Sequence, residues 1–283
     1  MKIGIIDVGG GLRDIYGAGV FDRLMDDGVT FDYCLGVSAG SANIVNYLAG
    51  QRGRNYRFYI EYSKRKEYIS ASNIAKKGAL LDLHYIYGTL SNSDGEDPLD
   101  YEAVMRNPAE LVVVATDAKT GEIRYFTKDD VVKDDYRIFM ASSAIPVITR
   151  FEEVGDAFFT DGGVGEPIPI ERAFADGCDK VVLVLTTPDA PMQAKTRDKV
   201  GAVMLHRSKP KVADLLRVRH EVYNHQRALA HKLADEGKVL IISPDDVLGV
   251  KTLTKDMDAL QKLYEKGYAD AEKIAAFMRE ARA

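Results

Sequence analysis

The N-terminal stretch KIGIIDVGGGLRD (Lys2–Asp14) passes from an apolar run into three glycines, and FDYCLGVSAGSAN (Phe31–Asn43) makes the same change later in the chain. An apolar run that ends in glycine and precedes an amphipathic segment is typical of a buried strand that turns into a helix. The expected strands are Lys2–Val8 and Phe31–Val37, and the expected helices are Ile15–Asp27 and Ala39–Leu48. Strands and helices that alternate this closely predict an α/β fold, with parallel strand pairing and helices on both faces of the sheet.

Later segments extend this sheet. Further buried strands are expected at Glu110–Thr116, Lys180–Leu185 and Lys238–Ile242. Glycine-containing turns between β-rich runs predict two antiparallel hairpins. The predicted hairpins pair Leu111–Asp117 with Glu122–Thr127, and Arg150–Val154 with Ala157–Thr160.

The remaining segments are predicted to be mostly helical. Arg52–Leu99 is aromatic-rich with weak periodicity, which favours a cap or insertion. Lys195–Glu236 is predicted to be helical with a break at Pro210, and Leu253–Ala283 is predicted to form two helices joined at Gly267. We therefore expect a main domain over residues 1–250, with a possible cap at 52–99, and a helical C-terminal extension over 251–283.

Composition restricts the classes of function. The 283 residues carry a net charge of −5, and 46% of them are hydrophobic, as in an ordinary globular protein. An acidic balance argues against broad nucleic-acid binding. The longest uncharged run, Tyr33–Gln51, is too polar to span a membrane. The two cysteines, Cys34 and Cys178, are expected to be buried free thiols, so we predict a cytoplasmic protein.

The pentapeptide Gly36-Val37-Ser38-Ala39-Gly40 is a G-x-S-x-G motif between a predicted strand and a predicted helix. This is the setting of a nucleophile elbow, in which a sharp turn exposes the serine hydroxyl. Gly36 and Gly40 would allow neighbouring backbones to approach closely. The alternative is that Ser38 only caps the helix that follows it.

A second motif, Gly9-Gly10-Gly11-Leu12-Arg13, also lies between a strand and a helix. Consecutive glycines expose backbone N–H groups, which suit a phosphate or a developing oxyanion. A dinucleotide-binding fingerprint would need glycine where the chain has Asp14, and no P-loop motif occurs. The alternative is an ordinary tight turn.

The third motif, Asp161-Gly162-Gly163, follows the apolar run Ala157–Thr160. A carboxylate at a strand end beside glycines is well placed to act as a general base. The alternative is an Asx-type turn, which Asp-Gly commonly forms.

Together, the three motifs in this order resemble the patatin-like phospholipase family, and its bacterial branch most closely. Ile15–Val20 and Ala141–Pro146 also resemble recurrent segments of that branch. The resemblance covers residues 2–170 and implies a patatin-like α/β sandwich: a mostly parallel sheet flanked by helices, with a helical tail. The family usually has glycine at the position of Asp14, so we expect this residue to alter the charge or flexibility of the glycine loop.

The resemblance implies a lipid acyl-ester hydrolase that forms an acyl-enzyme, with Ser38 as nucleophile and Asp161 as general base. Gly9, Gly10, Gly11 and Arg13 would form the oxyanion loop, and Gly162 and Gly163 would support Asp161. The implied substrate is a fatty-acyl ester or phospholipid, with no metal or organic cofactor. Two alternatives stay open: an α/β-hydrolase with a Ser–His–Asp triad, and a non-catalytic acyl-lipid-binding regulator.

Histidines and basic residues could serve other chemistry. No histidine follows a zinc-binding pattern, so no metal site is expected; the five are His84, His206, His220, His225 and His231. The segment Arg52–Tyr68 mixes basic and aromatic residues, which predicts weak contact with an anionic membrane or, alternatively, a capping helix with a charged, solvated side. A second basic cluster with the same two interpretations comprises Arg207, Lys209, Lys211, Arg217 and Arg219.

Overall fold

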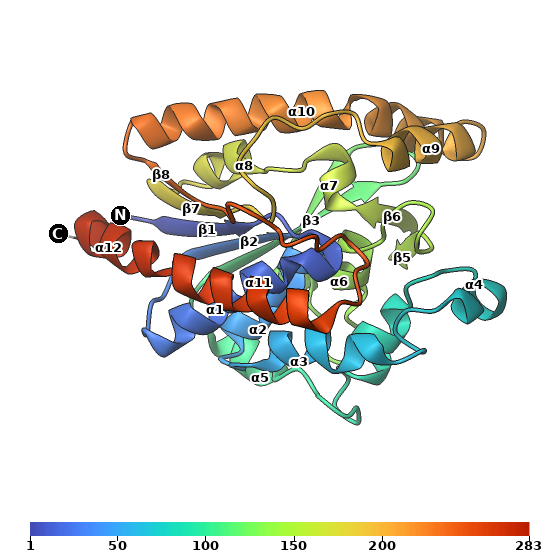
Figure 1. Ribbon diagram of the computed structural model, residues 1–283, viewed down its shortest axis with the longest axis horizontal. Coiled ribbons are helices and arrows are strands. Elements are labelled where there is room, and N and C mark those ends of the chain that lie inside the picture. The colour runs from blue at the N-terminus through green and yellow to red at the C-terminus, as the bar shows by residue number, and fades with distance from the viewer. Residues whose placement is uncertain (283) are drawn as a thin grey trace.

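The computed structural model describes residues 1–282 and contains one eight-stranded sheet (Figure 1). The strands pair in the order β5-β6-β3-β2-β1-β7-β8, and β4 pairs with β3. Their bounds are β1 Ile3–Asp7, β2 Tyr33–Val37, β3 Glu110–Asp117, β4 Ile123–Thr127, β5 Glu152–Val154, β6 Ala157–Asp161, β7 Lys180–Val184 and β8 Val239–Ile242. Every strand expected from the sequence is present, with ends shifted by at most two residues.

The central part of the sheet is parallel, as predicted. β1 pairs in parallel with β2 and β7, β2 with β3, and β7 with β8. Both predicted hairpins are antiparallel, because β4 pairs with β3 and β5 with β6 in that sense. The carboxyl ends of β1, β2 and β7 therefore meet at one edge of the sheet, where open α/β sheets usually bind their ligands.

Helices cover both faces of the sheet. In Figure 1, α1, α2, α3 and α11 lie below the sheet and α8 and α10 lie above it. A buried apolar cluster fills the space on each side. The α-helices are α1 Ile15–Asp26, α2 Ala39–Leu48, α3 Arg54–Ile60, α4 Ala71–Lys77, α5 Tyr101–Arg106, α6 Arg137–Ser142, α7 Gly162–Gly165, α8 Ile170–Ala175, α9 Thr196–Leu205, α10 Pro210–Asp235, α11 Met257–Asp270 and α12 Glu272–Arg282. Four shorter helical turns are η1 Gly11–Asp14, η2 Tyr62–Lys64, η3 Tyr85–Thr89 and η4 Lys128–Asp130.

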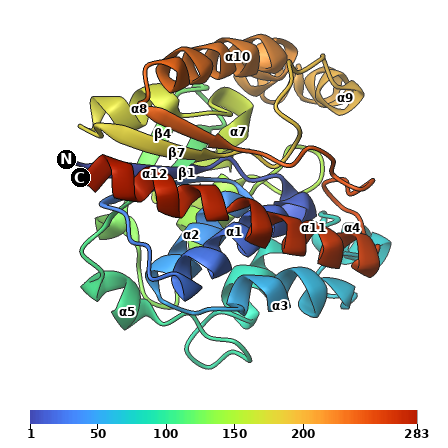
Figure 2. The same ribbon diagram turned by 60° about the vertical axis from the view of Figure 1, so that its left-hand side comes forward.

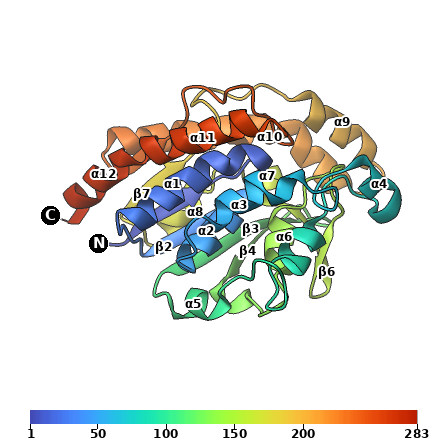
Figure 3. The ribbon, with the colours of Figure 1, turned by 60° about the horizontal axis from the view of Figure 1, so that its bottom comes forward.

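The prediction that Gly267 joins the last two helices is wrong. Gly267 lies inside α11, and the break between α11 and α12 comes at Ala271. A side chain on Gly267 would overlap the carbonyl oxygen of Tyr16, and one on Gly19 would overlap that of Tyr264. These glycines let α1 and α11 pack side by side with their backbones in near contact (Figures 2 and 3).

Two further expectations are confirmed. Pro210 is the first residue of α10, where proline's missing N–H costs no hydrogen bond, and it separates α10 from α9. Cys34 and Cys178 are buried free thiols. Within residues 1–282, no helix combines the length and the apolar character needed to cross a bilayer.

The register along β3 determines which residues meet at the site. β2 pairs with β3 as far as Val37 opposite Val114. β6 then pairs with the next residue of β3, because Asp161 lies opposite Ala115. β4 occupies the other edge of β3 over these positions, so β6 continues along the edge that β2 leaves. The turn that follows β2 and the last residue of β6 are thereby brought together.

Candidate active site

Ser38 occupies a sharp turn between β2 and α2. Its φ of 56° and ψ of −131° are unusual for a residue with a side chain, and such strain persists only where surrounding structure holds it. The backbone N–H of Ser38 donates to Ser142 Oγ at 2.8 Å. Gly36 and Gly40 leave room for the turn, since a Cβ on either would overlap the backbone of Ser41 or Asp7. The Ser38 side chain makes no capping bond to α2, so the helix-cap alternative is not what the structure shows.

The carboxylate of Asp161 accepts a hydrogen bond from the hydroxyl of Ser38. Ser38 Oγ donates to Asp161 Oδ2 at 2.6 Å, and Gly163 N donates to Asp161 Oδ1 at 2.8 Å. The Asx-type turn predicted as the alternative is therefore present, and it leaves the second carboxylate oxygen for Ser38. Only 8% of Asp161 is exposed. Burial raises the pKa of its carboxyl above 3.8, while the Ser38 hydrogen bond and the nearby Arg219 act in the opposite direction.

The glycine loop after β1 offers two free donors. Gly9 also belongs to the predicted oxyanion loop, and its N–H donates to Asp7 Oδ1 at 3.0 Å. Gly10 and Gly11 have φ values of 155° and 62°, which favour glycine, and their N–H groups donate to no acceptor within residues 1–282. Both glycines line the same cavity as Ser38. The guanidinium of Arg13 lies over Gly10, where a Cβ would be 3.1 Å from Arg13 Nη2.

Asp14 does not face the cavity. It is fully buried beneath the loop, where its carboxyl lies beside that of Asp7 and the amide of Asn43. Burial and the neighbouring Asp7 raise the pKa of Asp14 well above 3.8. Burial also raises the pKa of Asp7 to about 6, although hydrogen bonds from Gly9 and Asn43 lower it. The effect of Asp14 on the charge or flexibility of the glycine loop stays a prediction.

Two cavities meet at Ser38, and both include Gly11, Ile145 and Thr252 in their walls. The first lies beneath the Arg52–Leu99 segment. Its lining is mainly apolar and aromatic, as is typical of a site for a hydrophobic ligand. The main apolar contributors are Phe58, Tyr59, Leu81, Leu83, Ile86 and Phe139.

The second cavity is polar and holds four basic residues, of which Lys195 and Arg197 were not expected from the sequence. Arg13, Lys195, Arg197 and Arg219 line it together with Asp161 and Asp198. Arg219 was predicted to belong to a charged surface cluster, yet only 15% of its side chain is exposed and its Nε donates to the carbonyl of Gly163. No local pattern marks Lys195 or Arg197, because only the tertiary structure brings them to Ser38.

A family model for patatin-like phospholipases matches residues 8–174, which include all three motifs and the residues between them. The chain belongs to the patatin-like phospholipase family. A second family model, a domain of unknown function (DUF6363), matches residues 209–280. The patatin match accounts for the α/β architecture and leaves Lys195, Arg197 and Arg219 outside its bounds.

Two individual proteins are similar to this patatin-like chain. The uncharacterized protein YjjU of Escherichia coli (strain K12) is 27% identical over 194 residues, which are 66% of this chain and 52% of YjjU. The chain thus spans about half the length of that curated relative. The crystal structure of VipD from Legionella pneumophila aligns with a TM-score of 0.48 and 12% identity, over 96% of this chain and 66% of VipD.

No histidine lines either cavity at the patatin-like site within residues 1–282. His231 pairs with Asp189 at 2.9 Å and His84 with Glu152 at 3.3 Å, both away from the two cavities. The Ser–His–Asp alternative therefore has no histidine to supply its base. The described residues also contain no cluster of histidine, cysteine and carboxylate side chains suited to a metal ion.

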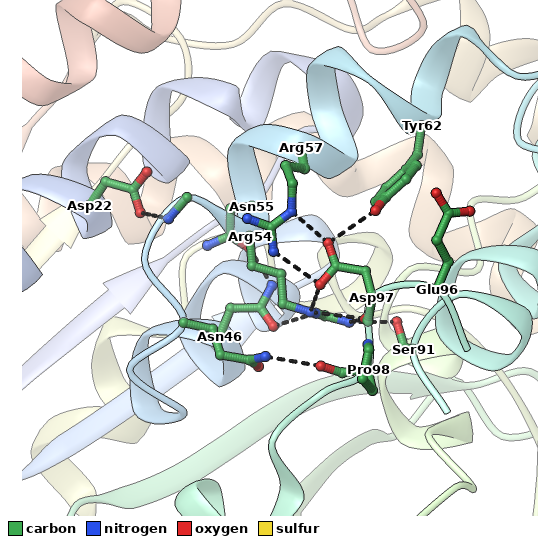
Figure 4. Close-up of polar contacts among 12 residues, drawn as sticks. Asp22, Asn46, Arg54, Asn55, Arg57, Tyr62, Ser91, Glu96, Asp97 and Pro98 are labelled. Atoms are coloured by element: carbon green, nitrogen blue, oxygen red, sulfur yellow. Dashed lines mark hydrogen bonds and ion pairs between the residues drawn. The ribbon is translucent and has the colours of Figure 1, made fainter. Parts of the chain in front are cut away.

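Two arginines of the Arg52–Tyr68 segment are held in ion pairs with one carboxylate (Figure 4). Arg54 and Arg57 both pair with Asp97, at 3.2 and 2.7 Å, and only 4% of the Arg54 side chain is exposed. Arg54 also donates to Ser91 Oγ at 2.9 Å. These bonds fasten α3 to the Ser91–Pro98 loop, so the segment forms one wall of the apolar cavity. A weak membrane contact stays a prediction that these two arginines do not support.

Proposed function

We propose that the protein is a serine hydrolase of fatty-acyl esters of lipids, with Ser38 as nucleophile and Asp161 as general base. The observation that carries this proposal is the 2.6 Å hydrogen bond from Ser38 Oγ to Asp161, at the junction of an apolar and a polar cavity. Serine is a weak nucleophile until an adjacent base accepts its proton. Asp161 is the buried carboxylate in position to do so.

In the proposed reaction, Asp161 takes the proton from Ser38 as the serine oxygen attacks the ester carbon. The carbonyl oxygen becomes an oxyanion, which the free N–H groups of Gly10 and Gly11 would stabilise. The C–O bond to the alcohol then breaks, and Asp161 returns the proton to the leaving oxygen. In the second half, Asp161 takes a proton from water as the water oxygen attacks the acyl carbon. The bond between that carbon and Ser38 Oγ then breaks, the proton passes to Ser38 Oγ, and the fatty acid is released.

The two cavities divide the substrate between them. We place the acyl chain in the apolar cavity beneath Arg52–Leu99 and the alcohol in the polar cavity. The proposed chemistry uses water and groups of this chain, with no metal or organic cofactor. We further infer a cytoplasmic location from the buried free thiols of Cys34 and Cys178, with any membrane contact weak and peripheral.

A fluorophosphonate probe tests the nucleophile, because it reacts with serines that are activated in this way. We expect mass spectrometry to find the adduct on Ser38. A Ser38→Ala variant should take up no probe and hydrolyse no p-nitrophenyl ester. A Ser208→Ala variant, changed at an exposed serine that lines neither cavity, should still be labelled at Ser38. Labelling at another serine would refute the nucleophile. Acyl-lipid binding without turnover would favour a non-catalytic regulator.

A further inference from the structure

The polar cavity collects four basic side chains from separate parts of the fold. Arg13 belongs to η1, Lys195 immediately precedes α9, Arg197 lies in α9, and Arg219 lies in α10. The carboxylates that line the same cavity are those of Asp161 and Asp198. The cavity wall thus carries two positive charges in excess when its basic groups are protonated.

The charges inside the cavity are incompletely paired. Arg219 Nη1 lies 3.3 Å from Asp198 Oδ2, and Arg197 Nε lies 3.5 Å from the other oxygen of Asp198. Lys195 forms no ion pair within residues 1–282, and Arg13 Nε is a buried donor without an acceptor there. Buried donors are nearly always satisfied in folded proteins, by protein groups, water or a ligand, and Arg13 Nε is free to donate to an anion in this cavity.

The environment of Lys195 also favours a bound anion in the polar cavity. Burial and the nearby positive charges of Arg219, Arg13 and Arg197 lower its pKa to about 8, and Asp198 opposes this only in part. Cations that are brought together out of water repel one another, and an anion bound between them offsets this repulsion. A bound anion would satisfy Arg13 and Lys195 and would remove this repulsion.

We propose that Arg13, Lys195, Arg197 and Arg219 bind a phosphate on the leaving alcohol, so that the preferred substrate is an acyl ester of an alcohol carrying a phosphate monoester. This inference rests on the proposed function and names its substrate class. The cluster shares the polar cavity with Ser38 and lies outside the apolar cavity. The alcohol attached to the scissile ester would extend into this polar cavity. Two excess positive charges match a dianionic monoester better than a zwitterionic diester.

Lys195 and Arg197 are the residues to test, because Arg219 also holds the Gly163 carbonyl and Arg13 lies over the glycine loop. The matched control is Lys199→Gln, an exposed residue of α9 that does not line the cavity. The substrates share one acyl chain: a 1-acylglycerol 3-phosphate, its choline diester and the uncharged monoacylglycerol. All variants are made in the full chain, and KM and kcat are measured for each substrate.

We expect Lys195→Gln and Arg197→Gln to raise KM for the phosphate monoester by about tenfold or more, as the loss of a charged hydrogen bond does. KM for the uncharged ester should change less than about twofold, and Lys199→Gln should leave both values unchanged. Glycerol 3-phosphate should compete with the monoester. Equal losses on all three substrates, or no preference of the wild type for the monoester, would overturn the phosphate site.

The pH dependence gives an independent readout. As the pH rises through about 8, Lys195 loses its charge, so KM for the phosphate monoester should rise while that for the uncharged ester stays level. The rise should be absent in Lys195→Gln. A KM profile that is the same for both esters would count against the proposal.

Binding to Ser38→Ala separates this inference from the proposed function. The 1-acylglycerol 3-phosphate should bind Ser38→Ala more tightly than the uncharged ester, and Lys195→Gln should remove the difference. If this preference is found and wild-type protein hydrolyses none of the esters, the anion site stands and the hydrolase proposal falls. If the wild type hydrolyses the uncharged ester without any phosphate preference, the hydrolase proposal stands and the anion site falls.

Discussion

The hydroxyl of Ser38 lies 2.6 Å from a carboxylate oxygen of Asp161, although 123 residues separate the two in the chain. The pairing register explains the contact, because β2 ends opposite Val114 of β3 and Asp161 lies opposite the next residue, Ala115. The contact between Ser38 and Asp161 is therefore held by strands of the central sheet. A geometry set by strand pairing is more precise than one set by mobile loops.

Replacing Asp161 with Asn should abolish most of the activity and preserve the fold. The substitution is nearly isosteric but removes the base, so we expect kcat to fall by about 10²–10⁴. Asp156→Asn, an exposed change in the turn of the same hairpin, should leave kcat unaltered. Ester hydrolysis and thermal melting of the two variants make the comparison. Turnover near the wild-type value in Asp161→Asn would rule out the general base.

The histidine variants complete this test. Single changes of His84, His206, His220, His225 and His231 to Gln should leave kcat within about tenfold. Activity should decline at low pH as Asp161 gains a proton, and the midpoint should lie above 3.8 because burial raises the pKa of this carboxyl. A folded histidine variant without turnover would establish a triad in place of the dyad.

Asp14→Asn should stabilise the protein at neutral and alkaline pH. The pKa of Asp14 is raised on folding, so the stability that its neutral form contributes is present at low pH and is lost as the pH rises. Asn keeps the shape and cannot ionise. We expect Tm of the variant to exceed that of the wild type at pH 8, by about 2–4 °C for each kcal/mol gained. The advantage should shrink toward pH 4. Equal Tm values at all pH values would show that Asp14 is ionised in the fold.

Changes in the apolar cavity should alter the preferred acyl chain length. Ala42→Leu adds volume to the cavity wall and should shift the preference toward shorter chains. Leu83→Ala removes volume and should shift it toward longer ones. Hydrolysis of p-nitrophenyl esters from C4 to C16 provides the measurement. Uniform losses across the series in both variants would mean that the acyl chain binds elsewhere.

Gly267→Ala tests the contact between α1 and α11. The added methyl group would overlap the Tyr16 carbonyl, so the helices must separate. Overpacking of this kind costs about 1–3 kcal/mol, and each kcal/mol lowers Tm by about 2–4 °C in a chain of this size. Gly88→Ala meets no atom within 4 Å and serves as the control. An unchanged Tm in Gly267→Ala would show that the two helices are not held this closely.

The sequence by itself determined the local elements of the site. Gly36–Gly40, Gly9–Gly11 and Asp161–Gly163 each join a strand to a helix, and short-range signals are sufficient to predict such turns. Apolar periodicity identifies the strand, and consecutive glycines permit the tight turn that follows it. The two hairpins could be predicted for the same reason, because each joins residues close together in the chain. The parallel sense of the sheet followed from the alternation of strands and helices.

Only the tertiary structure decided which distant side chains meet. Arg219 looked like a surface cation on an amphipathic helix, yet the packing of α10 turns it toward Gly163 and Asp198. Gly267 was expected to be a helix break, whereas the absence of a side chain there lets α1 pack closely against α11. Lys195 carried no signal at all. Long-range contacts of this kind depend on strand order, register and helix packing, and a single sequence contains no local pattern that specifies them.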